Sequence, residues 1–584
     1  MKINYTNEKN VLMLIKLLKE NNINKIIASP GTTNISFVTS LQHDPYFTIY
    51  SCVDERSACY MACGLATESN EPVVLTCTGA TASRNYIPGL TEAFYRKIPI
   101  LAVTCTQHFS RIGALSPQAL DRTKQLNDIV NLSVQIPTIS SREDEYGCNI
   151  LLNKAITALK RKGGGPVHIN LTTSYMYSNL FEIKKLPDYR VIHRYDIKDV
   201  FPKIGAKKIG IFVGNHCKWS NELTECVDRF CEIYNTYVIT DHTGNYAGKY
   251  KILANLIFDQ EQYDSPNNYY DLIIDIGEIS GAYLKINTKD VWRVNPDGEI
   301  RDRFFKLTKI FEMDELTFFK KYTDTDNERK NISNYTEIFK EYTKMREMAE
   351  VQNYPLSNIF VAKNIINKIP NRSTLHLAIL NSLRSWNYFS NDNNLDIYSN
   401  TGGFGIDGAV STLIGASLAH KDKLYFGVIG DLAFFYDLNS IGNKNIGNNL
   451  RIILINNGCG TEFHNYSHPA YNLGDLANDY IAADGHFGNK SDFLVKNYAE
   501  NLGFEYLCAN TKNEVLEKID YFTDEKLHDK SIIFEIFTNK QDESESLRLI
   551  RNLESDTKSK IKKAIKVITP AKAKYKVKKI LGRM

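Results

Sequence analysis

An acidic and an amide side chain each follow an apolar run in the last third of the chain. Asp431 comes shortly after residues 424–429, and Asn457 shortly after residues 452–455. Short continuous apolar runs are typical of buried parallel strands. Ligands of open α/β sheets bind beyond the carboxyl ends of such strands. We therefore expect the two side chains to lie together and to suit a hard divalent cation that keeps phosphate oxygens among its ligands.

Helix capping is the alternative for this pair, because Asp and Asn at strand ends commonly cap helices. Three other segments bear on the choice: residues 29–33 (SPGTT), 54–58 (DERSA) and 399–408 (SNTGGFGIDG). Together with residues 430–433 (GDLA), and in this order, they resemble thiamine diphosphate (ThDP) enzymes of the SEPHCHC synthase and acetolactate synthase branch. The metal motif of that superfamily is usually GDG. Leu432 at its third position is the form that occurs in the SEPHCHC synthase branch.

This resemblance implies ThDP and Mg²⁺ as cofactors. It implies that the side chains of Asp431 and Asn457 and the carbonyl of Cys459 hold the metal ion. Ile406 matches the apolar residue that bends the cofactor into a V shape, although without the resemblance it would be read as a core residue. The further cofactor-binding residues that the resemblance implies are Gly430, Leu432 and Ala433.

Glu55 and Gln118 are the candidate catalytic residues. Glu55 matches the family's carboxylate that bonds the aminopyrimidine ring, a bond that lets the cofactor's amine remove the thiazolium proton as a general base. The alternative for Glu55 is a carboxylate at a helix start, where it interacts with the helix dipole. Gln118 matches a polar residue on the family's substrate side.

The substrate side departs from SEPHCHC synthase, which uses arginines to hold the carboxylates of 2-oxoglutarate and isochorismate. Thr33, Gln107, Trp386 and Thr401 stand at the matching positions, so the bidentate carboxylate fork of arginine is missing at all four. The other candidate substrate residues are Thr32, Ser382, Glu462, Phe463 and His464. Glu462 and His464 are equally consistent with a helix surface.

These departures favour a smaller donor than 2-oxoglutarate. The predicted function is decarboxylation of a small, pyruvate-like 2-oxo acid and transfer of the acyl unit to an acceptor, with a sugar of a surface-glycan pathway as the suggested acceptor. A decarboxylase that releases an aldehyde is the nearest alternative, and a non-catalytic module with the same fold is a second. A nucleotide-dependent oxidoreductase is disfavoured, because no Gly-x-Gly-x-x-Gly loop follows the strand-like runs of residues 209–277.

Alternating helix-like and strand-like segments must position these residues, and they predict an α/β fold built from doubly wound parallel sheets. A chain of 584 residues is long enough for several domains. The predicted domains are a pyrimidine-binding domain (residues 1–185), a central scaffold (204–321) and a diphosphate-binding domain (355–540). The stretches between them, residues 186–203 and 322–353, are interpreted as linkers.

Composition limits the partners. The net charge is +4, which predicts no nucleic-acid partner. The eleven cysteines are scattered, which favours reduced thiols in a cytoplasmic protein. No uninterrupted apolar run reaches the roughly 20 residues that span a bilayer. The resemblance implies active sites formed between subunits, and therefore a homodimer or homotetramer.

A basic segment, residues 556–584, follows the part of the chain that resembles the family. Apolar residues at helical spacing among its lysines suggest an interfacial helix that binds anionic lipid, and hence peripheral membrane attachment. The alternative is a solvated basic tail.

Overall fold

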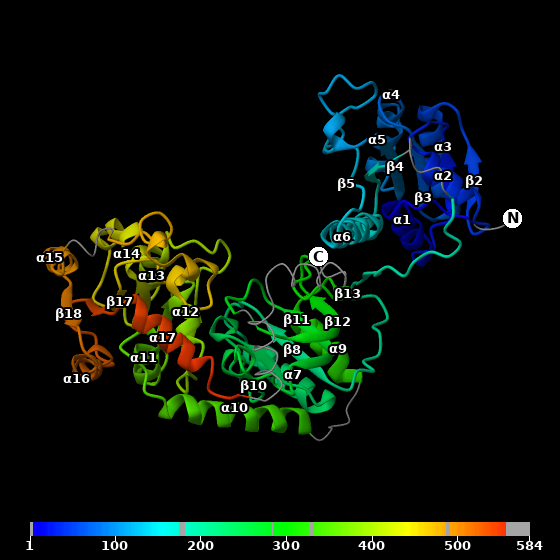
Figure 1. Ribbon diagram of the computed structural model, residues 1–584. Helices are drawn as coiled ribbons and strands as arrows, with labels where there is room; N and C mark the ends of the chain where they lie inside the picture. Colours follow the sequence, from blue (N-terminus) through cyan, green and yellow to red (C-terminus); the bar gives the residue numbers. More distant parts are fainter. Residues whose placement is uncertain (1–3, 175–180, 283, 326–331, 486–490, 556–584) are drawn as a thin grey trace. The chain divides into compact units, whose positions relative to one another are not determined.

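The computed structural model describes residues 4–174, 181–282, 284–325, 332–485 and 491–555 (Figure 1). The chain forms two compact units. The first holds Met1–Arg194 and Thr308–Ile310, and the second holds Tyr195–Leu307 and the described residues from Phe311 onward. The predicted basic tail lies outside the described residues.

The first unit is built on a six-stranded parallel sheet in the order β2-β1-β3-β4-β6-β5. Every residue of β3, β4 and β6 is buried, because helices cover both faces of the sheet. The strands are β1 (Lys25–Ala28), β2 (Thr48–Ser51), β3 (Val73–Cys77), β4 (Ile100–Thr106), β5 (Leu132–Ile136) and β6 (Val167–Thr172). The helices are α1 (Lys9–Glu20), α2 (Ile35–Gln42), α3 (Glu55–Ser69), α4 (Thr81–Arg84), α5 (Ile87–Tyr95) and α6 (Arg142–Ala158).

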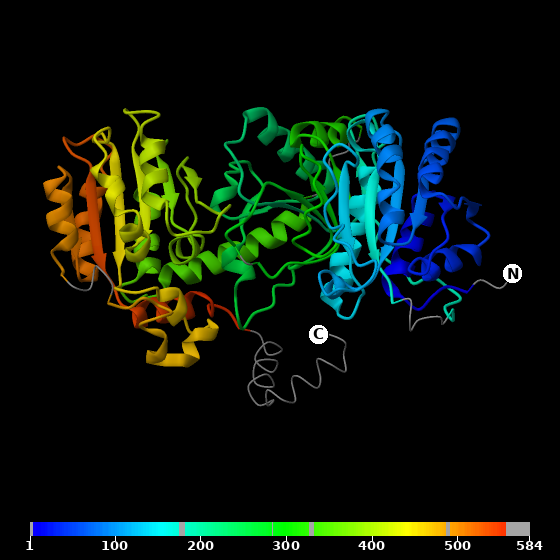
Figure 2. The same ribbon diagram turned by 90° about the horizontal axis from the view of Figure 1, so that it is seen from above.

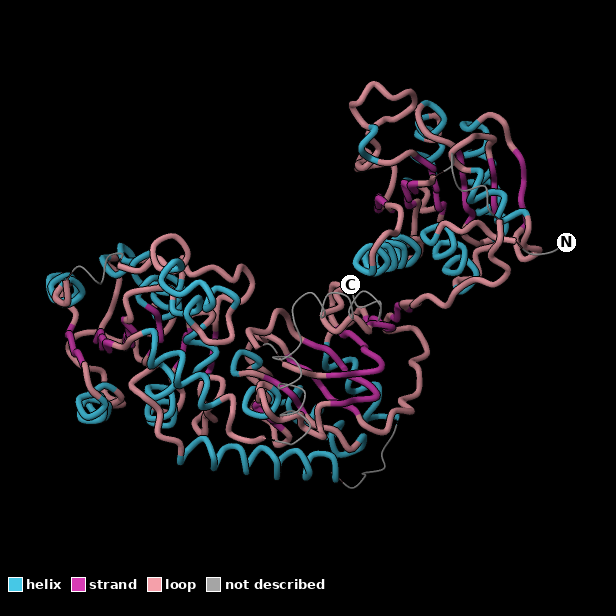
Figure 3. The backbone as a smooth tube through the Cα atoms, in the orientation of Figure 1, coloured by secondary structure: helices cyan, strands magenta, loops and turns pink. Residues whose placement is uncertain are grey.

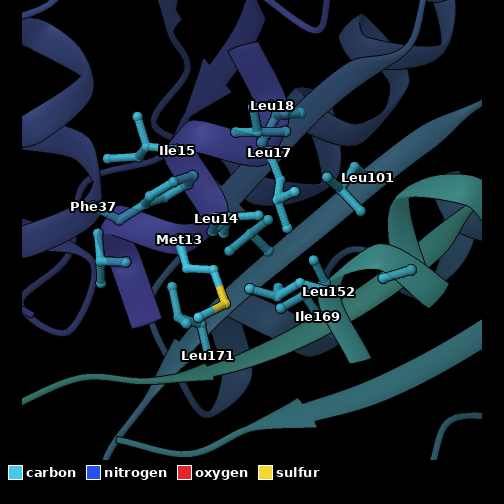
Figure 4. Close-up of a cluster of buried hydrophobic side chains, with 14 of the residues drawn as sticks. Met13, Leu14, Ile15, Leu17, Leu18, Phe37, Leu101, Leu152, Ile169 and Leu171 are labelled. Atoms are coloured by element: carbon cyan, nitrogen blue, oxygen red, sulfur yellow. The ribbon is translucent and has the colours of Figure 1, made fainter. Parts of the chain in front are cut away.

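Helix α1 supplies much of the core of this unit. Residues 10–15, Leu17 and Leu18 of the helix are buried. Figure 4 shows Met13, Leu14, Ile15, Leu17 and Leu18 of the helix in one apolar cluster with Leu101 of β4 and Leu171 of β6. Burying each such side chain contributes about 1.5–3 kcal/mol, so the docked helix fixes one face of the sheet.

The second unit contains two further sheets. In the first of them, five strands that lie wholly in this unit run parallel in the order β10-β9-β8-β11-β12. They are β8 (Ile209–Val213), β9 (Val238–Thr240), β10 (Lys251–Leu253), β11 (Tyr269–Ile276) and β12 (Asn287–Val294). The chain passes between the two units within β7 (His193–Tyr195) and β13 (Leu307–Phe311). The helices are α7 (Asn221–Tyr234), α8 (Asn255–Phe258), α9 (Glu315–Thr325) and α10 (Ser333–Val351).

The other sheet of the second unit carries the predicted metal motif. Its six parallel strands run in the order β15-β14-β16-β17-β19-β18, and Figure 2 shows helices on both of its faces. The strands are β14 (Thr374–Leu377), β15 (Asp396–Tyr398), β16 (Tyr425–Gly430), β17 (Leu450–Asn456), β18 (Glu505–Ala509) and β19 (Ile532–Phe537). The helices are α11 (Asn358–Ile365), α12 (Asn381–Trp386), α13 (Ala409–Ser417), α14 (Asp431–Tyr436), α15 (Leu494–Asn501), α16 (Lys512–Phe522) and α17 (Lys540–Ile550).

The predicted α/β fold class with parallel sheets is confirmed. The central and C-terminal sheets fall in one compact unit, so the domain boundaries at 204–321 and 355–540 stay a prediction. The stretch interpreted as the second linker contains the long helix α10, which buries Ile338, Tyr342 and Met345 (Figure 3). Among the described residues, no helix combines the length and the apolar character needed to span a membrane.

Candidate functional site

Asp431 lies where the sequence places it, at the carboxyl end of β16 and at the first position of α14. Its side chain is buried. Oδ1 accepts the backbone N–H of Leu432 at 2.8 Å, and Oδ2 accepts that of Gly458 at 2.5 Å. Burial raises the pKa of Asp431 from 3.8 to about 7, against the lowering effect of these hydrogen bonds. Because ionising a buried carboxyl is costly, the positive charge of a nearby cation would favour the ionised form, so Asp431 is suited to bind one.

The two asparagines after β17 have different roles. Asn456, the last residue of the strand, is buried and donates from Nδ2 to Oε1 of Glu535 on β19 at 2.7 Å. Asn457 follows, then Gly458 turns the chain with a φ of +78°, a conformation that glycine adopts without strain. The turn brings Asn457 and Cys459 to the wall of one cavity with Asp431. Asn456 therefore links β17 to β19, and Asn457 lines the cavity.

The cavity has a volume of about 130 Å³ and lies beyond the carboxyl ends of β14, β16 and β17. Three carboxylates line it: Asp431, Glu462 and Glu543. No lysine or arginine is among the described residues that line it. The structure brings ten of the predicted site residues to this wall: Ser382, Ile406, Gly430, Asp431, Leu432, Ala433, Asn457, Cys459, Glu462 and Phe463.

These residues fit a metal–diphosphate group. Asp431, Asn457 and Cys459 line one cavity, and a carboxylate, an amide and a backbone carbonyl are oxygen ligands of the kind that a hard divalent cation requires. Asp431 and Asn457 would hold the metal ion, with Ile406 on the apolar wall.

Three predicted residues of the second unit do not line this cavity. Trp386 has no exposed surface, and its indole N–H donates to Oδ1 of Asn358 at 3.0 Å. Thr401 is buried and its hydroxyl accepts from Nδ2 of Asn215 at 3.1 Å. Burial lowers the pKa of His464, whose Nε2 has no hydrogen-bond partner among the described residues. Their substrate-side roles stay predictions.

Two residues at or next to this wall, Asn381 and Arg384, are absent from the sequence-based prediction. Asn381 lies on the wall at the start of α12, after Leu380, whose φ of +63° is rare for a branched residue. Arg384 on the same helix pairs with Glu462 through two hydrogen bonds of 2.7 and 2.9 Å. Backbone strain such as that of Leu380 is common at functional sites. The sequence could have pointed to Asn381 and Arg384 in part, because they follow shortly after β14, a strand of the same sheet.

Glu543 is the third carboxylate of the cavity and another residue that the prediction missed. It lies on α17 and accepts the backbone N–H of Asn358 at 3.0 and 3.2 Å and the hydroxyl of Thr538 at 2.8 Å. Burial raises the pKa of Glu543 to about 7. It also satisfies a backbone donor at the first turn of α11, so it joins two helices at the cavity.

In the first unit, Glu55 is the first residue of α3. Asp54 caps this helix, with Oδ1 accepting the backbone N–H of Ser57 at 2.8 Å. Oε2 of Glu55 accepts a hydrogen bond from Nδ2 of Asn85 at 3.2 Å. The cap fixes the start of the helix, and with it the place from which the Glu55 side chain extends.

The remaining candidates of this unit follow β1 and β4. Thr33 is buried, shares a 2.6 Å hydrogen bond with the hydroxyl of Thr78 and donates to the carbonyl of Cys105. Thr32 and Gln118 are exposed, and Gln118 has a φ of +64°. Gln107 is half-buried and donates to the carbonyl of Pro117 at 3.4 Å. A bulky side chain with positive φ is uncommon, so the loop that carries Gln118 is held in a costly shape.

Arg122, in the same loop, is a further residue that sequence patterns do not single out. It is 3% exposed, and its Nη2 donates to the carbonyl of Cys105 at 3.4 Å. Nε and Nη1 have no hydrogen-bond partner among the described residues. Burial lowers the pKa of Arg122.

Comparison with known proteins gives a consistent result. Residues 11–127 match the family described as "Thiamine pyrophosphate enzyme, N-terminal TPP binding domain", thiamine pyrophosphate being another name for ThDP. The chain is 32% identical over 566 residues to the 2-succinyl-5-enolpyruvyl-6-hydroxy-3-cyclohexene-1-carboxylate synthase of Bacteroides thetaiotaomicron, which covers 93% of this chain and 98% of that protein. The enzyme of the same name from Phocaeicola vulgatus is also 32% identical, with the same coverage. That of Flavobacterium psychrophilum is 29% identical, over 90% of this chain and 95% of that protein.

Proposed function

The chain belongs to the family of 2-succinyl-5-enolpyruvyl-6-hydroxy-3-cyclohexene-1-carboxylate (SEPHCHC) synthases within the ThDP enzymes, and we propose that, unlike the resembled enzyme, it takes a small, pyruvate-like 2-oxo acid as its donor. The general reaction is that of the family: ThDP-dependent decarboxylation coupled to carbon–carbon bond formation. The chain accordingly uses ThDP with a divalent metal ion. The proposal concerns the metal, the catalytic residues, the donor and the acceptor.

Mg²⁺ is the proposed metal, held by Asp431, Asn457 and the carbonyl of Cys459. All three line the same cavity, and the raised pKa of buried Asp431 supports a cation beside it. Bound ThDP supplies a carbanion equivalent that the protein alone lacks. Asp431 and Asn457 would hold the metal ion and, through it, the diphosphate end of the cofactor. Ile406 presents an apolar contact on the same wall.

Glu55 is the proposed proton-handling residue. Its carboxylate extends from the capped start of α3, and Asn85 holds one oxygen of it by a single hydrogen bond. With ThDP bound, the Glu55 carboxylate would hold or release a proton beside the aminopyrimidine ring, a role that an amide cannot fill. Gln118 is proposed to contact the substrate from the same unit.

The lack of lysine and arginine among the described residues that line the cavity is the main support for the proposed donor. Three carboxylates line the cavity instead. Thr401 and Trp386, which stand at positions where the resembled enzyme has arginine, are buried and hydrogen-bonded to other residues. The second carboxylate of a donor such as 2-oxoglutarate would be desolvated there without a partner, which costs several kcal/mol. A monocarboxylic 2-oxo acid loses its one carboxylate as CO₂ and avoids this cost.

The acceptor is proposed to be a neutral, hydroxylated molecule such as a sugar. Asn381, Thr461 and Glu462 make the cavity wall polar next to the apolar ring of Phe463, and hydrogen bonds to one another or to Arg384 hold them in place. Such a mixed wall suits hydroxyl groups better than a second carboxylate. A step in surface-glycan synthesis would use an acceptor of this kind.

A homodimer or homotetramer in the cytoplasm is proposed as the working form, since the resembled enzymes complete their active sites between subunits. Peripheral attachment through residues 556–584 is a separate proposal, supported by the basic composition of that segment. Loss of binding to anionic vesicles after its deletion would support it. Equal binding of intact and shortened protein would dismiss it.

The experiment for the proposed function is mass spectrometry of the products formed with ThDP, Mg²⁺ and a panel of 2-oxo acids, with and without sugar acceptors. The proposal expects CO₂ release and a ligated product from pyruvate or a similar acid. An aldehyde as the sole product would identify the chain as a simple decarboxylase. Absence of CO₂ from every acid of the panel would favour a non-catalytic module.

A further inference from the structure

One charged pair has one member on the cavity wall, Glu462, and the other, Arg384, outside the lining. Arg384 on α12 donates from Nη1 to Oε2 of Glu462 at 2.7 Å and from Nη2 to Oε1 at 2.9 Å. About a fifth of each side chain is exposed, 21% and 20%. Both oxygens of Glu462 are thus engaged by the two arms of one guanidinium, the geometry in which arginine binds carboxylates most strongly.

The pair is fixed by its neighbours. Oδ1 of Asn381 accepts from Nη1 of Arg384 and from Nδ2 of Asn465, each at 3.1 Å. Asn465 also donates to Oε2 of Glu462 at 3.1 Å, and Asn381 donates to the hydroxyl of Thr461. Burial alone would lower the pKa of Arg384, but the ion pair with Glu462 outweighs it and raises that pKa. The guanidinium is therefore charged and occupied.

The positions of Glu462 and Arg384 relative to the cavity bear on whether a substrate carboxylate can bind there. Glu462 lines the cavity together with Asp431, whereas Arg384 is not among the described lining residues. Arg384 lies outside the lining and donates two hydrogen bonds to Glu462, a carboxylate of the lining. A substrate carboxylate that enters this side meets the negative charge of Glu462 first, and reaches Arg384 only by displacing it.

We propose that Glu462 occupies Arg384 as an internal carboxylate, so that the cavity rejects a second carboxylate on the donor and accepts monocarboxylic 2-oxo acids. Arg384 is then a latent carboxylate receptor, and Glu462 is the residue that determines donor class. This inference rests on the proposed function and names the residues behind its choice of donor.

The test compares Glu462→Gln and Glu462→Ala with the wild type and with Glu462→Gln/Arg384→Met. A matched control is Glu545→Gln, because Glu545 makes an equivalent two-armed pair with Arg548, at 2.8 and 2.6 Å, on the exposed side of α17. Binding of glutarate and of its uncharged diamide, glutaramide, both unreactive, is measured by calorimetry on the full-length protein. The ratio of kcat/KM for 2-oxoglutarate to that for pyruvate is measured on the ThDP-loaded enzyme.

We expect both Glu462 variants to gain roughly 10- to 100-fold in glutarate affinity, with glutaramide little changed, because an unoccupied guanidinium gains a bidentate carboxylate partner. The 2-oxoglutarate preference should rise by a similar factor. The Arg384→Met change should cancel both gains, and Glu545→Gln should match the wild type. Folded Glu462 variants with unchanged glutarate affinity would overturn the inference. Glutarate binding needs no turnover, so this outcome differs from a failure of the proposed function, in which no 2-oxo acid is decarboxylated.

Discussion

Asp431 and Gly458 are joined across neighbouring strands by a hydrogen bond of 2.5 Å, from the backbone N–H of Gly458 to Oδ2 of Asp431. The bond links the residue after β16 to the turn after β17, which carries Asn457 and Cys459. A single carboxyl group therefore sets the spacing of the proposed metal ligands. Its burial makes it costly to ionise while no cation is present.

Asp431→Asn should abolish metal-dependent binding of ThDP, because an amide brings no negative charge to the cation and can accept only one of the two backbone N–H groups that the carboxylate accepts. Calorimetric titration with ThDP and Mg²⁺ measures this, with Asp422→Asn, an exposed residue, as the matched control. ThDP affinity within a few-fold of the wild type would remove Asp431 from the metal site.

The pKa of Asp431 predicts a pH dependence of the cofactor-free protein. In the folded state the pKa is raised from 3.8 to about 7, so between these values the folded chain holds a proton that the unfolded chain has released. Stability should therefore fall as the pH rises from about 4 to 7, and Asp431→Asn should remove this part of the dependence, which is on the order of 1 kcal/mol or more. Thermal unfolding at several pH values checks it. Parallel curves for the two proteins would show that Asp431 ionises freely.

Glu55→Gln should keep ThDP bound and lower turnover by roughly 100-fold or more, because the amide cannot exchange a proton with the aminopyrimidine. Glu68→Gln, an exposed change on the same helix, is the control for helix stability. Steady-state kinetics together with cofactor titration separate binding from turnover. Near-normal turnover in the Glu55 variant would leave this carboxylate as a helix-start residue alone.

Arg122→Met should stabilise the cofactor-free protein by roughly 1–3 kcal/mol, since burying a guanidinium with unsatisfied donors costs more than burying an apolar chain of similar length. Nε and Nη1 lack partners among the described residues, and burial lowers the pKa of the group. The measurement is the midpoint of thermal unfolding. The exposed Arg142→Met serves as the control, expected within about 0.5 kcal/mol of the wild type. A lower midpoint for Arg122→Met would mean that the guanidinium contributes to folding.

The meeting of Asp431 and Asn457 could be predicted, because apolar runs mark buried strands and parallel strands end at one edge of a sheet. The different roles of Asn456 and Asn457 depend on which face each residue of β17 takes, and only the structure shows that Asn456 bonds Glu535. Arg384 and Glu462 are 78 positions apart, and nothing in either local pattern indicates their pairing. Residues joined through the fold alone, such as Glu543 and Asn358, escape prediction for the same reason.

The protein is proposed to use the family's fold and ThDP on a small 2-oxo acid in place of 2-oxoglutarate. The most direct measurement is a competition in which equimolar pyruvate and 2-oxoglutarate, each labelled with a different carbon isotope in the carboxyl that is lost, are given together to the enzyme with ThDP, Mg²⁺, isochorismate and a sugar mixture. Mass spectrometry of the released CO₂ and of the ligated products reads out the choice. We predict that CO₂ comes predominantly from pyruvate and that its acyl unit appears in the product. CO₂ mainly from 2-oxoglutarate, with its product joined to isochorismate, would contradict the account.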